Sequence, residues 1–101
     1  MIFSVSVFTR SYHNDVAGGL CEEQIMLVEA ESESEAISSA SKMAKDGETS
    51  YENESGELIC WKFMGVQSAY EIEDDLRSGS ELFSRHCSIH EANSLFETIK
   101  E

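Results

Sequence analysis

The stretch Glu57–Ile72 constrains the fold more than any other part of this sequence, because it is one long extended run in a chain that contains no proline. It is rich in Ile, Trp, Phe, Val and Tyr, which favour β-strands. A strand this long must twist or bend, and Gly65 near its middle predicts a bulge. Leu58, Cys60, Met64, Val66, Tyr70 and Ile72 share one parity, and Ile59, Trp61 and Phe63 share the other. We expect Trp61 to lie in the core.

The amino-terminal third predicts two more strands. Apolar side chains that alternate with serines predict a strand over Ile2–Thr9 with one buried face. The polar stretch Arg10–Gly19 predicts a connecting loop or a wide hairpin turn. The segment Glu23–Ala30 contains a run that is apolar on both faces, which predicts an interior, central strand.

A helix follows over about Glu33–Lys45. Ser32 and Glu35 have the spacing of a capping box, and the apolar residues after them recur at helical spacing. Gly47 is placed to end the helix in a left-handed conformation.

The remaining signals predict a turn at Glu54–Gly56 and a second polar turn at Asp74–Gly79. A last strand is expected over Glu81–Cys87. Ser88 and Glu91 repeat the capping box and predict a short carboxy-terminal amphipathic helix. Its apolar stripe consists of Ala92, Leu95, Phe96 and Ile99.

Together these elements predict an α+β fold with two layers. With a short extended segment around Tyr51, the order is β-β-α-β-β-β-α, and a mostly antiparallel sheet of about five strands carries the helices. The length of 101 residues suits a single globular domain over residues 1–101.

The charge balance excludes several classes of ligand. The chain has twenty acidic residues and only seven Lys and Arg, which gives a net charge of -13. Surfaces that track nucleic acid or anionic membranes need cations, so neither partner is expected. The apolar start is too short for a signal peptide or a membrane span, and we expect a cytoplasmic protein. The cysteines are expected to be reduced core thiols, namely Cys21, Cys60 and Cys87.

Several segments resemble a known family. They are the run Met26–Ser32 with its Glu and Ala continuation, Ser50–Asn53, Glu57–Phe63 and Glu81–Arg85. The chain resembles the bacterial "domain of unknown function 4288" family over most of its length, with the tail beyond Ser88 as an extension. The resemblance implies a small stand-alone domain, and it supplies no catalytic residue, cofactor or substrate.

The sharpest chemical cluster is His86, Cys87 and His90, since imidazole and thiolate bind zinc. It lacks the paired spacing of a closed zinc site, and the predicted helix begins between the two histidines. A small enzyme or metal-binding domain built on these residues is the alternative function. We expect no enzyme activity, no cofactor and no metal requirement. Cys87 is expected to be buried beside the cap.

The leading hypothesis is a non-enzymatic protein-interaction module of the immunity or antitoxin type that covers a basic site on another protein. Its support is electrostatic, because acidic surfaces speed association with cationic partners. The alternative use of this charge is a solvated surface that resists aggregation. The candidate partner surface consists of Glu52, Glu54, Glu57, Glu71, Glu73, Asp74 and Asp75.

Overall fold

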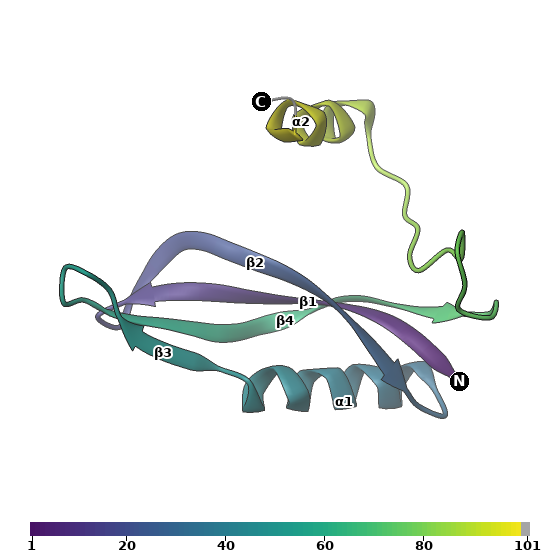
Figure 1. Cartoon of the computed structure of the whole chain (residues 1–101), viewed down its shortest axis with the longest axis horizontal. Coiled ribbons are helices and arrows are strands. Elements are labelled where there is room, and N and C mark those ends of the chain that lie inside the picture. Colours follow the sequence, from purple (N-terminus) through teal and green to yellow (C-terminus); the bar gives the residue numbers. More distant parts are fainter. Residues whose placement is uncertain (100–101) are drawn as a thin grey trace.

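The computed structural model describes residues 1–99, with side chains through residue 96. The strands are β1 (Ile2–His13), β2 (Val16–Glu29), β3 (Thr49–Glu52) and β4 (Leu58–Ile72), and the helices are α1 (Glu33–Asp46) and α2 (Ile89–Ile99). All neighbouring strands are antiparallel in the order β2-β1-β4-β3, and α1 packs on one face of the sheet (Figure 1). The predicted α+β class is confirmed. No helix within residues 1–99 is long and apolar enough to cross a membrane.

Within the described residues the sheet has four strands, so the predicted fifth strand over Glu81–Cys87 is wrong. This segment is held by side chains instead of a backbone ladder. The Tyr70 hydroxyl donates to Glu81 Oε2 at 3.0 Å, and the Tyr70 ring meets Phe83 edge-on with the ring centroids 6.3 Å apart. The observed order is therefore β-β-α-β-β-α.

A hairpin does connect the two strands, as one of the two predictions for Arg10–Gly19 has it, but it is tight and not wide, because β1 and β2 continue through this stretch. Asn14 and Asp15 have φ angles of 50° and 66°, the left-handed conformation that a two-residue hairpin turn requires. Gly18 lies within β2, where a Cβ atom would stand 2.7 Å from Ser11 Oγ. Glycine here marks a close approach of two strands and not a loop.

Strand β2 is an edge strand, which contradicts its predicted central place. Its residues Ile25 and Leu27 are 49% and 55% exposed, whereas Val28 is buried and Met26 packs on the core. The apolar run has two apolar faces, but α1 covers only one of them. The central strands are β1 and β4.

Helix α1 begins as its sequence predicts. The Ser32 Oγ accepts the Glu35 N–H at 3.2 Å, and Glu35 Oε2 accepts the Glu31 N–H at 3.3 Å. The prediction that Gly47 is left-handed is wrong, since its φ is -90°. Its N–H donates to the Met43 carbonyl at 3.0 Å.

The second capping box is confirmed at α2, where Ser88 Oγ accepts the Glu91 N–H at 3.1 Å. The side chain of Ile99 in the predicted α2 stripe lies outside the described side chains.

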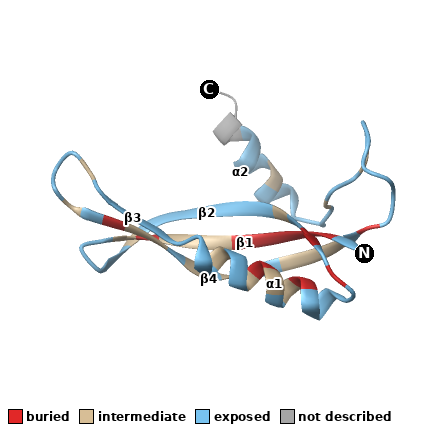
Figure 2. Cartoon of the chain, turned by 60° about the horizontal axis from the view of Figure 1, so that its bottom comes forward, coloured by how far each residue is buried: buried red, intermediate tan, exposed pale blue. Residues whose placement is uncertain are grey.

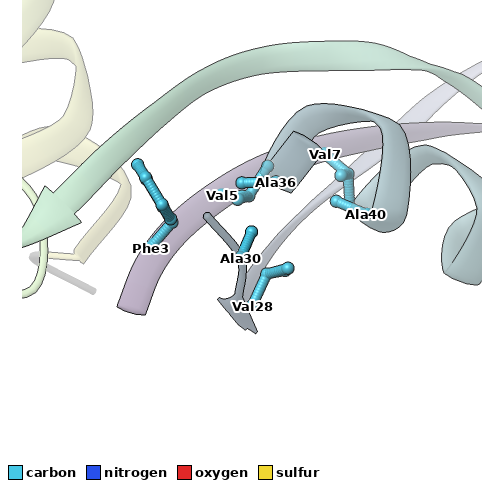
Figure 3. Close-up of a cluster of buried hydrophobic side chains, with 7 residues drawn as sticks. All are labelled: Phe3, Val5, Val7, Val28, Ala30, Ala36 and Ala40. Carbon is cyan, nitrogen blue, oxygen red and sulfur yellow. The ribbon is translucent and has the colours of Figure 1, made fainter. Parts of the chain in front are cut away.

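The core lies between α1 and the half of the sheet that α1 covers (Figure 3). Two helix alanines face the apolar row of β1, and their small size lets the helix sit close to the strand. Each fully buried valine of this row contributes about 1.5 to 3 kcal/mol. The buried cluster consists of Phe3, Val5, Val7, Val28, Ala30, Ala36 and Ala40.

Strand β4 bends through two bulges that flank Gly65. Relative to β1, it carries one extra residue at Met64 and another at Gln67. The extra residue at Met64 moves Val66 to the face of Phe63, so the predicted parity is wrong there. The extra residue at Gln67 reverses the shift, and Tyr70 and Ile72 lie on the face of Cys60 as predicted. The half-buried β4 residues that pack on the core are Phe63, Val66 and Ala69.

Candidate functional site

A hollow of about 460 Å³ opens on the helix-covered face of the sheet, beyond the carboxy-terminal end of α1. Helix α1 has 14 residues and β4 has 15. A helix rises about 1.5 Å per residue and a strand about 3.3 Å, so α1 covers about half of the length of β4. Figure 2 shows buried residues on α1 and β1, while β2 and the β3–β4 hairpin are mostly exposed. The uncovered half of this face forms the floor of the hollow.

The lining of the hollow combines sulfur, aromatic and acidic side chains. Trp61 forms part of the floor and is half-buried, which corrects its predicted place in the core. Tyr51 lies on the same face from β3 and is 52% exposed. Met26 and Met43 close the end nearest the core. The floor is therefore a polarizable surface that stays partly in contact with solvent.

Two carboxylates stand at opposite edges of the hollow. Glu22 belongs to β2 and Glu48 precedes β3, and these strands form the two edges of the sheet. Glu48 Oε2 accepts the Phe63 N–H at 2.8 Å, and this bond holds the Glu48 side chain in place. Phe63 lies just beyond the residues of β4 that pair with β3. Among the described residues, neither Lys nor Arg lines the hollow.

The seven acidic residues of the predicted partner surface fall into two groups at opposite ends of the sheet (Figure 1). Glu52, Glu54 and Glu57 lie at the β3–β4 turn, and Glu71 to Asp75 lie at the far end of β4. The molecule measures 47 Å along its longest axis. One small partner site cannot include both groups.

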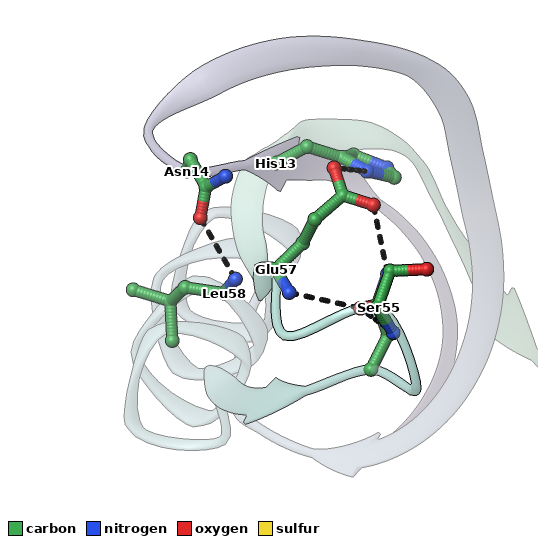
Figure 4. A network of polar contacts seen from close by, with 6 residues as sticks. His13, Asn14, Ser55, Glu57 and Leu58 are labelled. Atoms are coloured by element: carbon green, nitrogen blue, oxygen red, sulfur yellow. Dashed lines mark hydrogen bonds and ion pairs between the residues drawn. The ribbon is translucent and has the colours of Figure 1, made fainter.

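Glu57 is engaged within its own turn (Figure 4). Asn53 Nδ2 donates to Glu57 Oε1 at 3.1 Å, and His13 Nδ1 lies 3.8 Å from Glu57 Oε2. Asn14 Oδ1 accepts the Leu58 N–H at 2.9 Å and ties the β1–β2 turn to the start of β4. Glu57 stabilises this junction and is less available to a partner than Glu54, which is exposed.

The alternative site residues are all exposed. His86 and Cys87 lie on the segment before α2, and His90 lies in its first turn. Among the described residues, no group of three or more His, Cys, Asp or Glu side chains could hold a metal ion. The prediction that the three cysteines lie in the core is wrong. Cys21 and Cys87 are exposed, and Cys60 is half-buried. All three cysteines are free.

Sequence reasoning missed the hollow, including Glu22, Glu48, Tyr51 and Trp61. A signal was available in the lengths of the predicted elements. A helix over Glu33–Lys45 is too short to cover a strand over Glu57–Ile72, so part of one sheet face had to stay open.

Comparison with known proteins gives one match. The family model described as Domain of unknown function (DUF4288) matches residues 2–84. The matched region includes the sheet and α1 and ends before α2. No curated protein and no solved structure matches the chain.

Proposed function

The chain belongs to the DUF4288 family of domains of unknown function, and from this premise we propose that it is a non-enzymatic protein-interaction module with a basic protein partner. We propose in particular an immunity or antitoxin-like role, which suits a small acidic domain. Such a protein would cover a basic site on its partner, in the cytoplasm.

The observation that carries this proposal is how little of the negative charge is neutralised. The chain has twenty Asp and Glu residues against seven Lys and Arg. Within the described residues only one Lys or Arg ion pair forms, Lys42 with Asp46, and His13 Nδ1 lies 3.8 Å from Glu57 Oε2. Among the described residues, the remaining carboxylates form no ion pair with a Lys, Arg or His, so their field extends into solvent.

A field of this sign favours a cationic partner for a physical reason. Uncompensated charge steers an oppositely charged protein toward the surface and raises the association rate, while like-charged proteins are repelled. Nucleic acid and anionic membranes are repelled by the same field. The partner expected from charge alone is therefore a basic protein.

Affinity capture with three baits tests the proposal. The first bait is the wild-type chain, and the second carries Glu71→Gln, Glu73→Gln, Asp74→Asn and Asp75→Asn. The third carries Glu52→Gln and Glu54→Gln at the opposite end of the sheet. Glu57 is kept in this bait because it accepts a hydrogen bond from Asn53 within the β3–β4 turn. All substituted residues are exposed, so the three baits should have nearly equal stability.

We expect a basic protein to be retained by the wild-type bait at low salt and to be released as salt rises. One of the two substituted baits should retain less of it, which identifies the end that binds. The proposal fails if the retained proteins show no basic excess, or if rising salt does not release them from the wild-type bait.

A further inference from the structure

We infer that the hollow beyond the end of α1 is the pocket for one long cationic side chain of the partner, with arginine favoured over lysine. This inference rests on the proposed function and adds the chemistry of one contact. It begins with the arrangement of charge around the hollow.

Negative charge flanks the hollow on two sides, and no cation lies among its described lining residues. Glu22 and Glu48 come from the two edges of the sheet, which are separated by the width of four strands. Neighbouring strands lie about 4.8 Å apart, so roughly 14 Å separates the edges. The Glu48 side chain is held by the Phe63 N–H, and this bond leaves its charge intact. A cationic group that enters the hollow meets carboxylates from both sides.

Aromatic side chains form the surface between the two carboxylates. Trp61 and Tyr51 lie on the same face of the sheet, because Tyr51 pairs with Ile59, two residues before Trp61. Trp is the strongest partner in cation–π contacts, and a planar guanidinium both stacks on such rings and binds carboxylates through two parallel hydrogen bonds. These two preferences favour arginine.

The chain already uses this chemistry at neighbouring rings. The Lys45 ammonium lies 5.5 Å from the centre of the Phe63 ring, and the Lys62 ammonium lies 5.0 Å from the centre of the Tyr12 ring. No such contact occurs at Trp61 within the described residues. Trp61 therefore remains available to a cation from outside.

The size of the hollow suits a whole side chain. Its volume of about 460 Å³ lies in the range of ligand pockets, about 300 to 1,000 Å³. The methionines at its inner end offer a soft apolar contact to the methylene groups that carry the charged head.

A titration with capped arginine tests the inference, and Trp61 is the single tryptophan of the chain, so its fluorescence reports from the hollow. The probe is N-acetyl-arginine amide, and its neutral isostere N-acetyl-citrulline amide is the control ligand. Amide chemical-shift mapping of the same titration gives a second readout if the fluorescence does not change. We expect the arginine probe to shift signals of Tyr51, Trp61 and Thr49 and to bind about tenfold more tightly than the citrulline probe.

The matched variants separate the pocket from the general negative field. Glu22→Gln with Glu48→Gln should weaken arginine binding about tenfold, and the side-chain amide introduced by Glu48→Gln keeps an oxygen that can accept the Phe63 N–H. Glu71→Gln with Glu73→Gln removes equal charge at the far end and should change binding less than twofold. Equal binding of the two probes, or equal loss in both variants, would overturn the inference.

The outcomes also separate this inference from the proposed function. If a basic partner is captured and binds the Glu22→Gln, Glu48→Gln variant as tightly as the wild type, the inference fails and the function stands. If the arginine probe binds selectively and no basic partner is captured, the pocket stands and the function fails.

Discussion

Two aromatic residues show how position in the fold decides what a side chain contributes. Phe3 is 2% exposed in the cluster beneath α1. Trp61 is larger but lies in the floor of the hollow, beyond the end of the helix. Both are apolar residues of central strands, and their sequence contexts suggest the same role. The structure separates them because α1 is shorter than the sheet.

Substitution of these two residues should therefore give unequal losses of stability. Phe3→Ala should lower the free energy of unfolding by about 3 to 5 kcal/mol, since it empties a fully packed site. Trp61→Ala should lower it by about 1 to 2 kcal/mol, because a half-buried ring loses less apolar contact. Urea unfolding of both variants measures the difference. A larger loss for Trp61 than for Phe3 would place Trp61 in the core after all.

Tyr70 joins the sheet to the segment that follows it. The pKa of Tyr70 is raised above its ordinary value of 10.0, mainly because its hydroxyl donates to the Glu81 carboxylate, which stabilises the protonated phenol. The folded chain thus holds this proton more tightly than the unfolded chain. The resulting stability is present below pH 10 and is lost as the pH rises through the folded pKa.

Ultraviolet absorbance titration measures this effect. The difference between wild type and Tyr70→Phe gives the titration of Tyr70, and we expect its midpoint above that of a free tyrosine. In Glu81→Gln, the midpoint should move to lower pH. An unchanged midpoint in Glu81→Gln would show that the Glu81 carboxylate does not raise the pKa of Tyr70 in solution.

At the scale of elements, local rules predicted the helices and missed the sheet order. Ser32 and Glu35 define the start of α1 through contacts within one turn, so the sequence was sufficient. The place of β2 depends on which strand β1 pairs with and on which face α1 covers, and no short segment encodes either. The Asn14–Asp15 turn carried a hairpin signal that the nearby glycines obscured.

Helix α2 should be dispensable for the stability of the sheet. Within the described residues it packs against no other helix or strand, and the family match ends before it. Truncation after Arg85 keeps the Tyr70 contacts to Glu81 and Phe83. We expect the free energy of unfolding to change by less than about 0.5 kcal/mol. A loss above about 2 kcal/mol would show that α2 packs on the sheet or on another copy of the chain.

At the scale of the whole molecule, the proposed binding of a basic partner rests on the negative charge and on the elongated shape of the sheet. The acidic composition is plain in the sequence, and so is the expectation of a cationic partner. The separation of the acidic groups to the two ends of β4, and the hollow between Glu22 and Glu48, depend on the strand order and on the length of α1. These features become visible only once the strands are assembled.

The central claim is that the acidic surface steers a basic partner, and the association rate constant tests it most directly. Stopped-flow mixing of the chain with its captured partner should be measured at ionic strengths of about 0.02 M and 0.3 M, where the Debye length falls from roughly 20 Å to about 6 Å. The account predicts a rate constant at least about tenfold lower at the higher ionic strength, with a smaller change in the dissociation rate. An association rate constant that is the same at both ionic strengths would contradict the claim.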